Sequence, residues 1–223
     1  TGIFADDAGL QKHIDAGAKK VLLSVPPKSK ADSKIKIIVM GVNDNILEPG
    51  DTMISNASCT TNCLAPMAKV IHENFGIVKG FMTTIHSFPT DQPSLDWPHQ
   101  ALRRARAAAL SMVPTSTGAA KALHLVLPQL KGKLDGLAIR VPTPNVSLVD
   151  LSVEVEQDCD VASVNAAFKQ AAQGPLKGIL KYSEAPIVSV DQNGDPHSAT
   201  LDAPLTIVSN GRMVKVLAWY DNK

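Results

Sequence analysis

Apolar and polar positions along this chain follow different periods before and after residue 58. Residues 7–17 place apolar side chains at helical spacing, and Gly17 is suited to end that helix. The runs 21–25 and 35–42 are continuous apolar stretches of strand length. A helix followed by two buried strands is typical of the edge of a mostly parallel sheet.

From residue 58 onward, the pattern predicts one long helix followed mainly by strands. This helix covers 58–75, ends before Gly76 and contains Pro66, which either kinks it or marks its first turn. Further helices are predicted over 117–127 and 161–173. Strands are predicted over 80–85, 137–141, 146–155, 179–182, 187–190, 205–208 and 213–219. Runs of strands with few helices indicate an α+β fold, with a mixed, largely antiparallel sheet and helices on one face.

Composition narrows the class of protein. Charged residues make up 19% of the chain and the formal net charge is +1, so no general field attracts nucleic acid or an anionic membrane surface. No apolar run approaches the ~20 residues of a membrane-spanning helix. The three cysteines argue against a disulfide framework and fit a reducing compartment. We therefore expect a cytoplasmic globular protein with neither a nucleic-acid nor a membrane partner.

The start of the long helix is the strongest candidate for chemistry, because Cys59 stands there between Ser58 and Thr60. Unpaired N–H groups and the helix dipole at such a position favour the thiolate, which is the reactive form of cysteine. The alternative is a small buried residue in a turn rich in Ser and Thr, and the residues alone leave both interpretations open. Cys63 follows one helical turn later and is expected to pack.

A reactive thiol needs a base, and His86 is the best placed of the six histidines. It stands at the end of the predicted strand 80–85, where a long loop begins, and a strand end is a rigid mount for a group that points into a cleft. His72 and His124 lie within helical patterns and are expected at the surface or in packing. Pairing of the thiolate with an imidazolium would favour the reactive form and supply a proton shuttle.

Three further features suit an anion. The turn before the helix 117–127 is rich in hydroxyl groups, which bind phosphate at a helix start, although the alternative for Thr117 is a plain N-cap. Arg103 belongs to the long basic loop 87–113, where it either contacts phosphate or lies on a solvated helix face. Arg140 interrupts an apolar strand and needs a partner, either a bound anion or a structural salt bridge.

Several motifs of other enzyme classes are missing from the sequence. It contains no G-x-G-x-x-G, Walker or G-x-S-x-G motif and no cluster of Cys and His at metal-ligand spacing. A metal enzyme or a serine hydrolase is therefore not expected, and no metal ligand is assigned. The candidate chemistry depends on the thiol.

Six longer segments together resemble one known family. They are SNASCTTNC at 55–63, TTIHS at 83–87, LRRARAAA at 102–109, VPTSTGAAK at 113–121, RVPTPNVS at 140–147 and VKVLAWYDN at 214–222. In order and spacing they resemble the phosphorylating glyceraldehyde-3-phosphate dehydrogenases, and LRRARAAA is more similar to the bacterial and plastid branch. The resemblance covers nearly the whole chain.

The resemblance implies an NAD-dependent phosphorylating aldehyde dehydrogenase of glycolysis. It would oxidise glyceraldehyde 3-phosphate to 1,3-bisphosphoglycerate, with inorganic phosphate as cosubstrate and NAD rather than NADP as the hydride acceptor. Cys59 would form a thiohemiacetal and then a thioester, with His86 as the base. The implied substrate- and phosphate-binding residues are Ser58, Thr60, Thr90, Arg103, Thr117, Gly118 and Arg140.

The family also implies where the cofactor and neighbouring subunits meet this chain. Asn222 matches the residue that holds the nicotinamide carboxamide. Pro98 lies in a loop segment that resembles the NAD-preferring version. Residues 87–113 match the S-loop, which reaches a neighbouring subunit's cofactor in a homotetramer.

Two departures from the family affect these expectations. Pro89 stands three residues after His86, where the family usually has a Thr that contacts the substrate phosphate, so Thr90 is assigned that contact. The Gly-rich turn that binds the cofactor phosphates belongs to the family's first part. Residues 1–57 are therefore expected to be the carboxyl-terminal remnant of a Rossmann-type α/β dinucleotide-binding domain, and residues 58–223 the catalytic domain.

Two other functions share the same residues. An erythrose-4-phosphate dehydrogenase would use the same Cys and His pair on a longer sugar phosphate. A catalytically incomplete fragment would keep only residual thiol esterase chemistry, because a thioester can also release its acid to water. Comparison of substrates separates these functions.

Overall fold

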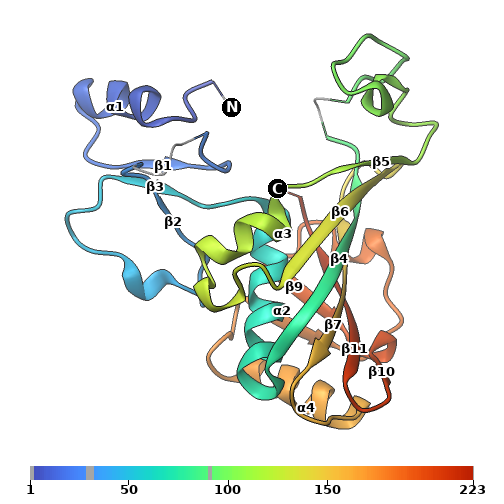
Figure 1. The fold of residues 1–223 in the computed structure, drawn as a ribbon. Coiled ribbons are helices and arrows are strands. Elements are labelled where there is room, and N and C mark those ends of the chain that lie inside the picture. The colour runs from blue at the N-terminus through green and yellow to red at the C-terminus, as the bar shows by residue number, and fades with distance from the viewer. Residues whose placement is uncertain (1–2, 29–32, 90–91, 223) are drawn as a thin grey trace.

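The described part of the chain forms two sheets that share no strand. The computed structural model describes residues 3–28, 33–89 and 92–222. Figure 1 shows the smaller sheet near the amino terminus and the larger sheet in the rest of the molecule. All strands of the smaller sheet precede residue 56, and all strands of the larger sheet follow residue 76.

The smaller sheet is parallel and is accompanied by one helix. Helix α1 (Asp7–Asp15) begins at Asp6, whose side chain accepts the N–H of Gly9 at 2.8 Å. The strands are β1 (Val21–Leu23), β2 (Lys36–Ile37) and β3 (Met53–Ser55), in the order β1-β3-β2. Parallel pairing on both sides of β3 agrees with the expected α/β character of this part of the chain.

The strand predicted over 35–42 is wrong beyond Ile37. The side chain of Asn43 accepts the N–H of Val39 at 2.8 Å, which draws the backbone into a turn that leads to the short 3-10 helix η1 (Asp44–Ile46). Ile38 and Val39 are nevertheless buried. The apolar run therefore correctly predicts that Ile38 and Val39 are buried, but their backbone is not that of a strand.

The larger sheet has eight strands and is mixed. In chain order they are β4 (Ile77–Ser87), β5 (Val113–Ser116), β6 (Leu134–Val141), β7 (Ser147–Val155), β8 (Leu180–Ser183), β9 (Ala199–Asp202), β10 (Ile207–Ser209) and β11 (Met213–Tyr220). Their spatial order is β5-β6-β4-β7-β11-β9-β8, and β10 pairs with β11. Among the described strand pairs of this larger sheet, only β4·β6 and β8·β9 are parallel. The predicted α+β class with a largely antiparallel sheet is confirmed.

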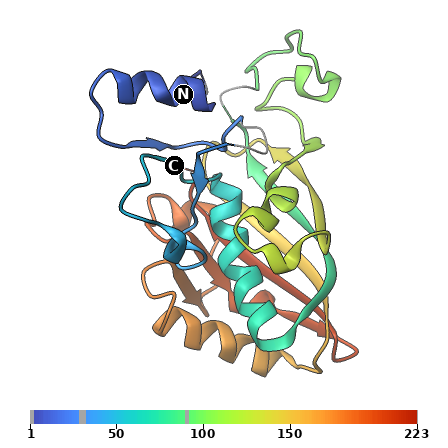
Figure 2. The same ribbon diagram turned by 60° about the vertical axis from the view of Figure 1, so that its left-hand side comes forward.

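Helices α2 (Cys59–Phe75), α3 (Ala119–Ala122) and α4 (Val161–Gln173) cover one face of this sheet (Figure 2). Helix α2 packs against β4, β7, β9 and β11, and α4 packs against α2 and β8. Along β7 the buried side chains alternate with half-buried ones, so one face of the sheet meets the helices and the other is partly wet. The predicted placement of the helices on one face is therefore confirmed.

Helix α2 has the boundaries that its sequence predicts. Ser58 is the N-cap, and Gly76 ends the helix with a positive φ of 69°, which glycine adopts at no steric cost. Pro66 is buried inside the helix rather than in its first turn. Helix α4 also matches its predicted range, and the Asp160–Ser163 capping box fixes its start.

Other predicted elements are shorter or different. The helix predicted over 117–127 is reduced to α3, followed by the 3-10 helices η3 (Leu123–Leu125) and η4 (Pro128–Leu130). The strand predicted over 187–190 is wrong, because Asp191 accepts the N–H of Val188 at 2.8 Å and starts the 3-10 helix η5 (Ser189–Gln192). The strand predicted over 205–208 begins only after the 3-10 helix η6 (Ala203–Leu205).

Strands β3, β5 and β9 are absent from the prediction. Strand β5 contains Pro114 and lies at the edge of the sheet, where a residue without an N–H is tolerated. Strand β9 is buried at all four positions and therefore shows no alternation of apolar and polar residues. None of the helices in the described part of the chain is both long and apolar enough to span a bilayer.

Candidate active site

Cys59 is the first residue of helix α2. The side chain of Ser58 accepts the N–H of Thr61 at 3.1 Å, which fixes the start of the helix. The first N–H groups of a helix have no partner within it, and the dipole places partial positive charge there. The half-buried thiol of Cys59 therefore lies in a field that favours a negative charge on sulfur.

His86 brings its imidazole to this thiol from the end of strand β4. Its Nε2 lies 3.7 Å from the Sγ of Cys59, and the ring is buried. Its Nδ1 lies 2.6 Å from the carbonyl oxygen of Ser87. Because a carbonyl only accepts hydrogen bonds, Nδ1 carries the proton in the neutral ring and the lone pair of Nε2 faces the thiol. The ring is thus oriented to take the thiol proton.

Asn222 reaches the same point from the end of strand β11. Its Nδ2 lies 3.3 Å from the Nε2 of His86 and 3.9 Å from the Sγ of Cys59. Helix α2 and the ends of strands β4 and β11 therefore meet at one thiol. The structure brings together the three residues that the sequence assigned to catalysis and to the nicotinamide.

A pair of serines holds the side chain of Asn222. The hydroxyl of Ser87 donates to its Oδ1 at 2.8 Å, and the hydroxyl of Ser147 lies 2.8 Å from its Nδ2. The hydroxyl of Ser147 also accepts the N–H of Ser87 at 3.0 Å. Both serines are buried, so these bonds are shielded from water. They couple the ends of β4, β7 and β11.

Tyr220 lies beneath the pair and is almost completely buried, with 2% of its surface exposed. Its hydroxyl is 2.8 Å from the hydroxyl of Thr60 and 2.8 Å from that of Thr84. Burial raises the pKa of Tyr220 strongly, and a negative Cys59 nearby raises it further, so the phenol stays protonated. Its ring meets the ring of His86 edge to face, with centroids 6.0 Å apart.

Two residues beside the site have a backbone conformation that is uncommon without glycine. Ala57 has a φ of 57° and lies two residues before Cys59. Val146 has a φ of 67° and precedes Ser147. For a β-branched residue this conformation costs on the order of 1–3 kcal/mol, and such strain concentrates at functional sites.

Arg140 lies directly beside His86 in the sheet. The two residues are register partners in the parallel pair β4·β6, so their side chains point to the same face. Arg140 is half-buried. A guanidinium at this place puts a positive charge near the imidazole and suits an anionic part of a substrate.

Thr117 and Arg103 line a hollow of about 810 Å³ on the larger sheet. The remaining lining residues are Phe81, Ala101, Leu102, Pro114, Thr115, Ser116, Asp135, Gly136 and Leu137. The hydroxyl of Thr117 accepts the N–H of Ala119 at 3.2 Å, but the N-cap of α3 is Gly118. Thr117 therefore bonds to the first turn of α3 from the residue before the N-cap, and its contact with an anion stays a prediction. Arg103 is exposed in the 3-10 helix η2 (Leu102–Ala105).

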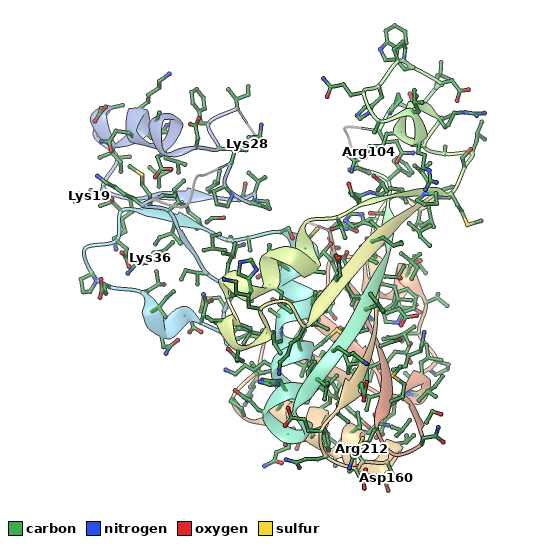
Figure 3. All side chains as sticks on the ribbon, in the orientation of Figure 1. Lys19, Lys28, Lys36, Arg104, Asp160 and Arg212 are labelled. Atoms are coloured by element: carbon green, nitrogen blue, oxygen red, sulfur yellow. The ribbon has the colours of Figure 1, made fainter. Side chains whose placement is uncertain are left out.

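The loop between β4 and β5 projects beyond the end of the sheet (Figure 1). Figure 3 labels Arg104 in this projection, where its side chain donates to the hydroxyl of Thr115 at 2.9 Å. Asp96 steadies the loop by accepting the N–H of Ala107 at 2.8 Å. Pro98 is exposed in this loop, and no described contact joins it to the thiol. Thr90 lies outside the described residues.

Cys63 and Cys159 are also free thiols. Cys63 is fully buried one turn after Cys59, and burial raises its pKa well above the usual value, as does the charge of Cys59. Burial also raises the pKa of Cys159, whose Sγ lies 3.3 Å from the carbonyl oxygen of Gly211. Of the three, Cys59 is the thiol that faces a base.

Sequence reasoning missed Ser87, Ser147, Thr84 and Tyr220. The first three are small hydroxyl residues within strands and carry no local pattern. Tyr220 was visible as a polar-tipped aromatic at the end of a strand, because a buried tyrosine usually finds a partner for its hydroxyl. That partner lies 160 positions away at Thr60, beyond the reach of any local pattern.

Comparison with known proteins agrees with this geometry. The model of the family described as "Glyceraldehyde 3-phosphate dehydrogenase, C-terminal domain" matches residues 58–222. The chain is 60% identical over 224 residues to a glyceraldehyde-3-phosphate dehydrogenase of Geobacillus stearothermophilus, and 58% identical to one of Bacillus subtilis. A relative from Streptomyces coelicolor is 60% identical. Each comparison covers all of this chain and 66% of the relative.

The arrangement and these likenesses lead to one assignment. A thiol at a helix start, an imidazole 3.7 Å away and a buried amide beside both lie within the matched region. The identity extends over the whole chain, including the smaller sheet. The chain spans about two thirds of the length of these curated relatives. It belongs to the glyceraldehyde-3-phosphate dehydrogenase family.

Proposed function

We propose that the protein oxidises glyceraldehyde 3-phosphate to 1,3-bisphosphoglycerate by way of a thioester on Cys59. The observation that carries this proposal is the approach of the His86 Nε2 to the Cys59 Sγ at the start of helix α2. A thiol with a base at hydrogen-bonding range is the arrangement required for covalent catalysis on a carbonyl carbon. Family membership and the names of the relatives support the same reaction.

The residues of the site account for the covalent steps. His86 takes the thiol proton at Nε2, and the thiolate attacks the aldehyde carbon to give a thiohemiacetal. The backbone N–H groups at the start of α2 stabilise the oxyanion, and the imidazolium of His86 returns its proton to give the thiohemiacetal hydroxyl. As the carbon is oxidised, His86 takes that hydroxyl proton back at Nε2. Inorganic phosphate attacks the resulting thioester, and the Cys59 thiolate leaves as the acyl phosphate forms.

The hydroxyl and guanidinium groups that the resemblance assigns to phosphate supply two sites in this proposal, although Thr117 and Arg103 line the hollow together with Phe81 and Leu137. Ser58, Thr117 and Gly118 serve the inorganic phosphate, and the hydroxyl of Thr60, which bonds to Tyr220, faces the core instead. Thr60 therefore serves through its backbone N–H. Arg140 serves the substrate phosphate from its place beside His86, and Arg103 approaches from the loop. Thr90 keeps its assigned contact with the substrate phosphate as a prediction.

The residues of this chain fit the nicotinamide end of NAD. The Asn222 side chain places an N–H donor, Nδ2, 3.9 Å from the Sγ of Cys59, and such a donor suits the oxygen of a carboxamide. NAD, when bound, supplies the acceptor for the hydride that leaves the thiohemiacetal carbon. The loop that carries Pro98 contributes the preference for NAD over NADP. The sequence has no G-x-G-x-x-G turn, so these residues account for that end of the cofactor alone.

Activity of the full-length protein that carries this sequence tests the proposal. Formation of NADH from glyceraldehyde 3-phosphate and NAD should require inorganic phosphate. The variant Cys59→Ser should lose nearly all turnover and keep its circular dichroism spectrum, because serine is a far weaker nucleophile. Cys159→Ser is the matched control and should retain activity. Turnover by Cys59→Ser at the rate of the natural protein contradicts the mechanism.

One observation favours a second substrate. Pro89 replaces the usual Thr three residues after His86, and its carbonyl oxygen accepts the N–H of Gln92 at 3.0 Å. Because proline has no side-chain hydroxyl, position 89 donates no hydrogen bond to the phosphate of the three-carbon substrate, which weakens its binding. Erythrose 4-phosphate is therefore the alternative, and the ratio of the two kcat/KM values decides between them.

We further propose a homotetramer located in the cytoplasm. The loop between β4 and β5 extends away from its own sheet, as a segment that serves a neighbouring subunit must. Sedimentation velocity of the full-length protein tests the assembly, and cell fractionation tests the location. A monomer at micromolar concentration contradicts the first proposal, and secretion contradicts the second.

A further inference from the structure

The Tyr220 hydroxyl joins the two elements that carry the proposed catalytic pair. Thr60 follows Cys59 in the first turn of helix α2, and Thr84 precedes His86 by two residues in strand β4. The phenol oxygen is 2.8 Å from both threonine hydroxyls. Thr60, Thr84 and Tyr220 are all buried.

We propose that Tyr220 is a positioning residue that holds the Cys59 thiol and the His86 imidazole at their working distance. This inference depends on the function proposed above, because it concerns the same pair. The described hydrogen bonds of the Tyr220 hydroxyl go to Thr60 and Thr84 rather than to the thiol. It acts through the two threonines and through the edge of its ring against the His86 imidazole.

The sheet explains why a long side chain is required. Strand β7 lies between β4 and β11, so Tyr220 is not a direct neighbour of Thr84. The register partner of Tyr220 on β7 is Ser147, a small residue beside which the phenol ring can extend toward β4. The ring therefore spans one whole strand, and its hydroxyl reaches the helix above and β4 beyond.

The two hydrogen bonds make the bridge specific. A protonated phenol has one proton to donate and lone pairs that accept, so its oxygen can bond to both threonine hydroxyls at once. Burial keeps water from replacing either bond. Phenylalanine at position 220 would keep the ring and its packing and would remove both bonds. Helix α2 and strand β4 would then move relative to each other with less restraint.

Alkylation of Cys59 by iodoacetamide tests this role in the full-length protein. The pH dependence of the rate is measured for the natural protein and for Tyr220→Phe, with the labelled residue identified by peptide sequencing. We expect Tyr220→Phe to react about tenfold more slowly at neutral pH. The midpoint of its pH–rate profile should move to higher pH, because a thiolate less well paired with the imidazole is less favoured.

Three further variants make the test selective. Tyr182→Phe is the matched control, since Tyr182 is the other tyrosine of this sequence and lies half-buried on β8. Its profile should coincide with that of the natural protein. Thr84→Val removes one bond of the bridge with little change of shape and should shift the profile as Tyr220→Phe does. Thr84→Ser keeps the hydroxyl and should restore the natural profile.

The outcomes separate this inference from the proposed function. If Tyr220→Phe lowers the melting temperature and leaves the pH–rate profile unchanged, Tyr220 is only structural and the inference is wrong. If Cys59 of the natural protein reacts no faster than Cys159, the proposed function and this inference both fail. If Tyr220→Phe does not fold, Thr84→Val provides the test. A shift of its pH–rate profile to higher pH supports the inference, and an unchanged profile contradicts it.

Discussion

His72 is a single side chain that closes the end of helix α2. Its Nδ1 accepts the N–H of Ile77 at 2.9 Å, so the backbone entering strand β4 is held by a neutral imidazole. Burial lowers the pKa of His72, and Lys133 lowers it further, while Glu156 and Glu73 act in the opposite direction. The bond exists only while Nδ1 is unprotonated.

A pH dependence of stability follows at this residue. Because the folded pKa is below the unfolded value of about 6.5, the contribution is complete above that value and is lost as pH falls through the folded pKa. The free energy of unfolding in urea should fall between pH 7.5 and pH 5 in the natural protein. In His72→Gln this fall should be smaller by about 1 kcal/mol. An equal loss in both proteins would exclude His72 as the cause.

The residue scale also shows how far the sequence predicts the site. Cys59 and His86 have local signatures, a helix start with polar flanks and a strand end before a long loop. Ser147 has no such signature, and the position of Tyr220 at a strand end does not identify its partners, because both roles depend on contacts made across three strands. Hydroxyl groups in strands are common, and only the sheet order shows which of them meet.

At the scale of elements, two central strands approach closely because one residue has no side chain. Gly136 on β6 pairs with Met82 on β4, and a methyl group added there would lie 2.1 Å from the Met82 carbonyl oxygen. No real side-chain carbon tolerates this distance to a backbone atom. The parallel pair that aligns Arg140 with His86 depends on this close approach.

Gly136→Ala should therefore destabilise the protein by about 1–3 kcal/mol, the usual cost of overpacking. The free energy of urea unfolding measures this loss. Gly50→Ala is the control, because a methyl group on Gly50 meets no atom within 4 Å and its backbone has ordinary φ. An equal change in the two variants would show that the strand pair adapts.

Some helices and strands are predictable from the sequence and others are not. Helices α2 and α4 match their predicted ranges because capping residues mark their ends. The run at 35–42 is a strand only at Lys36–Ile37, and the run at 187–190 is not a strand, because the side chains of Asn43 and Asp191 bond to nearby N–H groups. Such local competition is decided by geometry that a hydropathy pattern does not contain.

At the scale of the whole molecule, the sheet face opposite the helices carries exposed apolar residues. Phe81 on β4 is 73% exposed, and Leu137 on the neighbouring strand β6 is 44% exposed. With Leu102 they line the hollow described above. A contiguous apolar patch of this kind marks a protein interface more often than a free surface.

Phe81→Glu should weaken the proposed tetramer, because assembly would bury a charge without a partner. Sedimentation velocity at a series of protein concentrations should show dissociation at higher concentration than in the natural protein. Val161→Glu is the control, since Val161 is 41% exposed at the first position of α4, where an acidic residue suits the helix dipole. Identical profiles for Phe81→Glu and the natural protein would place the interface elsewhere.

The central place of β11 has a consequence for how the protein folds during its synthesis. This strand is the latest of the described strands along the chain, yet it lies between β7 and β9 in the middle of the sheet. In a nascent polypeptide that ends before Met213, strands β5-β6-β4-β7 and strands β9-β8 are not yet joined by β11. The hydroxyl of Thr60 then lacks Tyr220, its partner 160 positions later in the chain. Closure of such distant contacts is slow. The thiol therefore acquires Tyr220 and Asn222 as neighbours only after synthesis has passed this strand, so unfinished chains lack part of the site around Cys59.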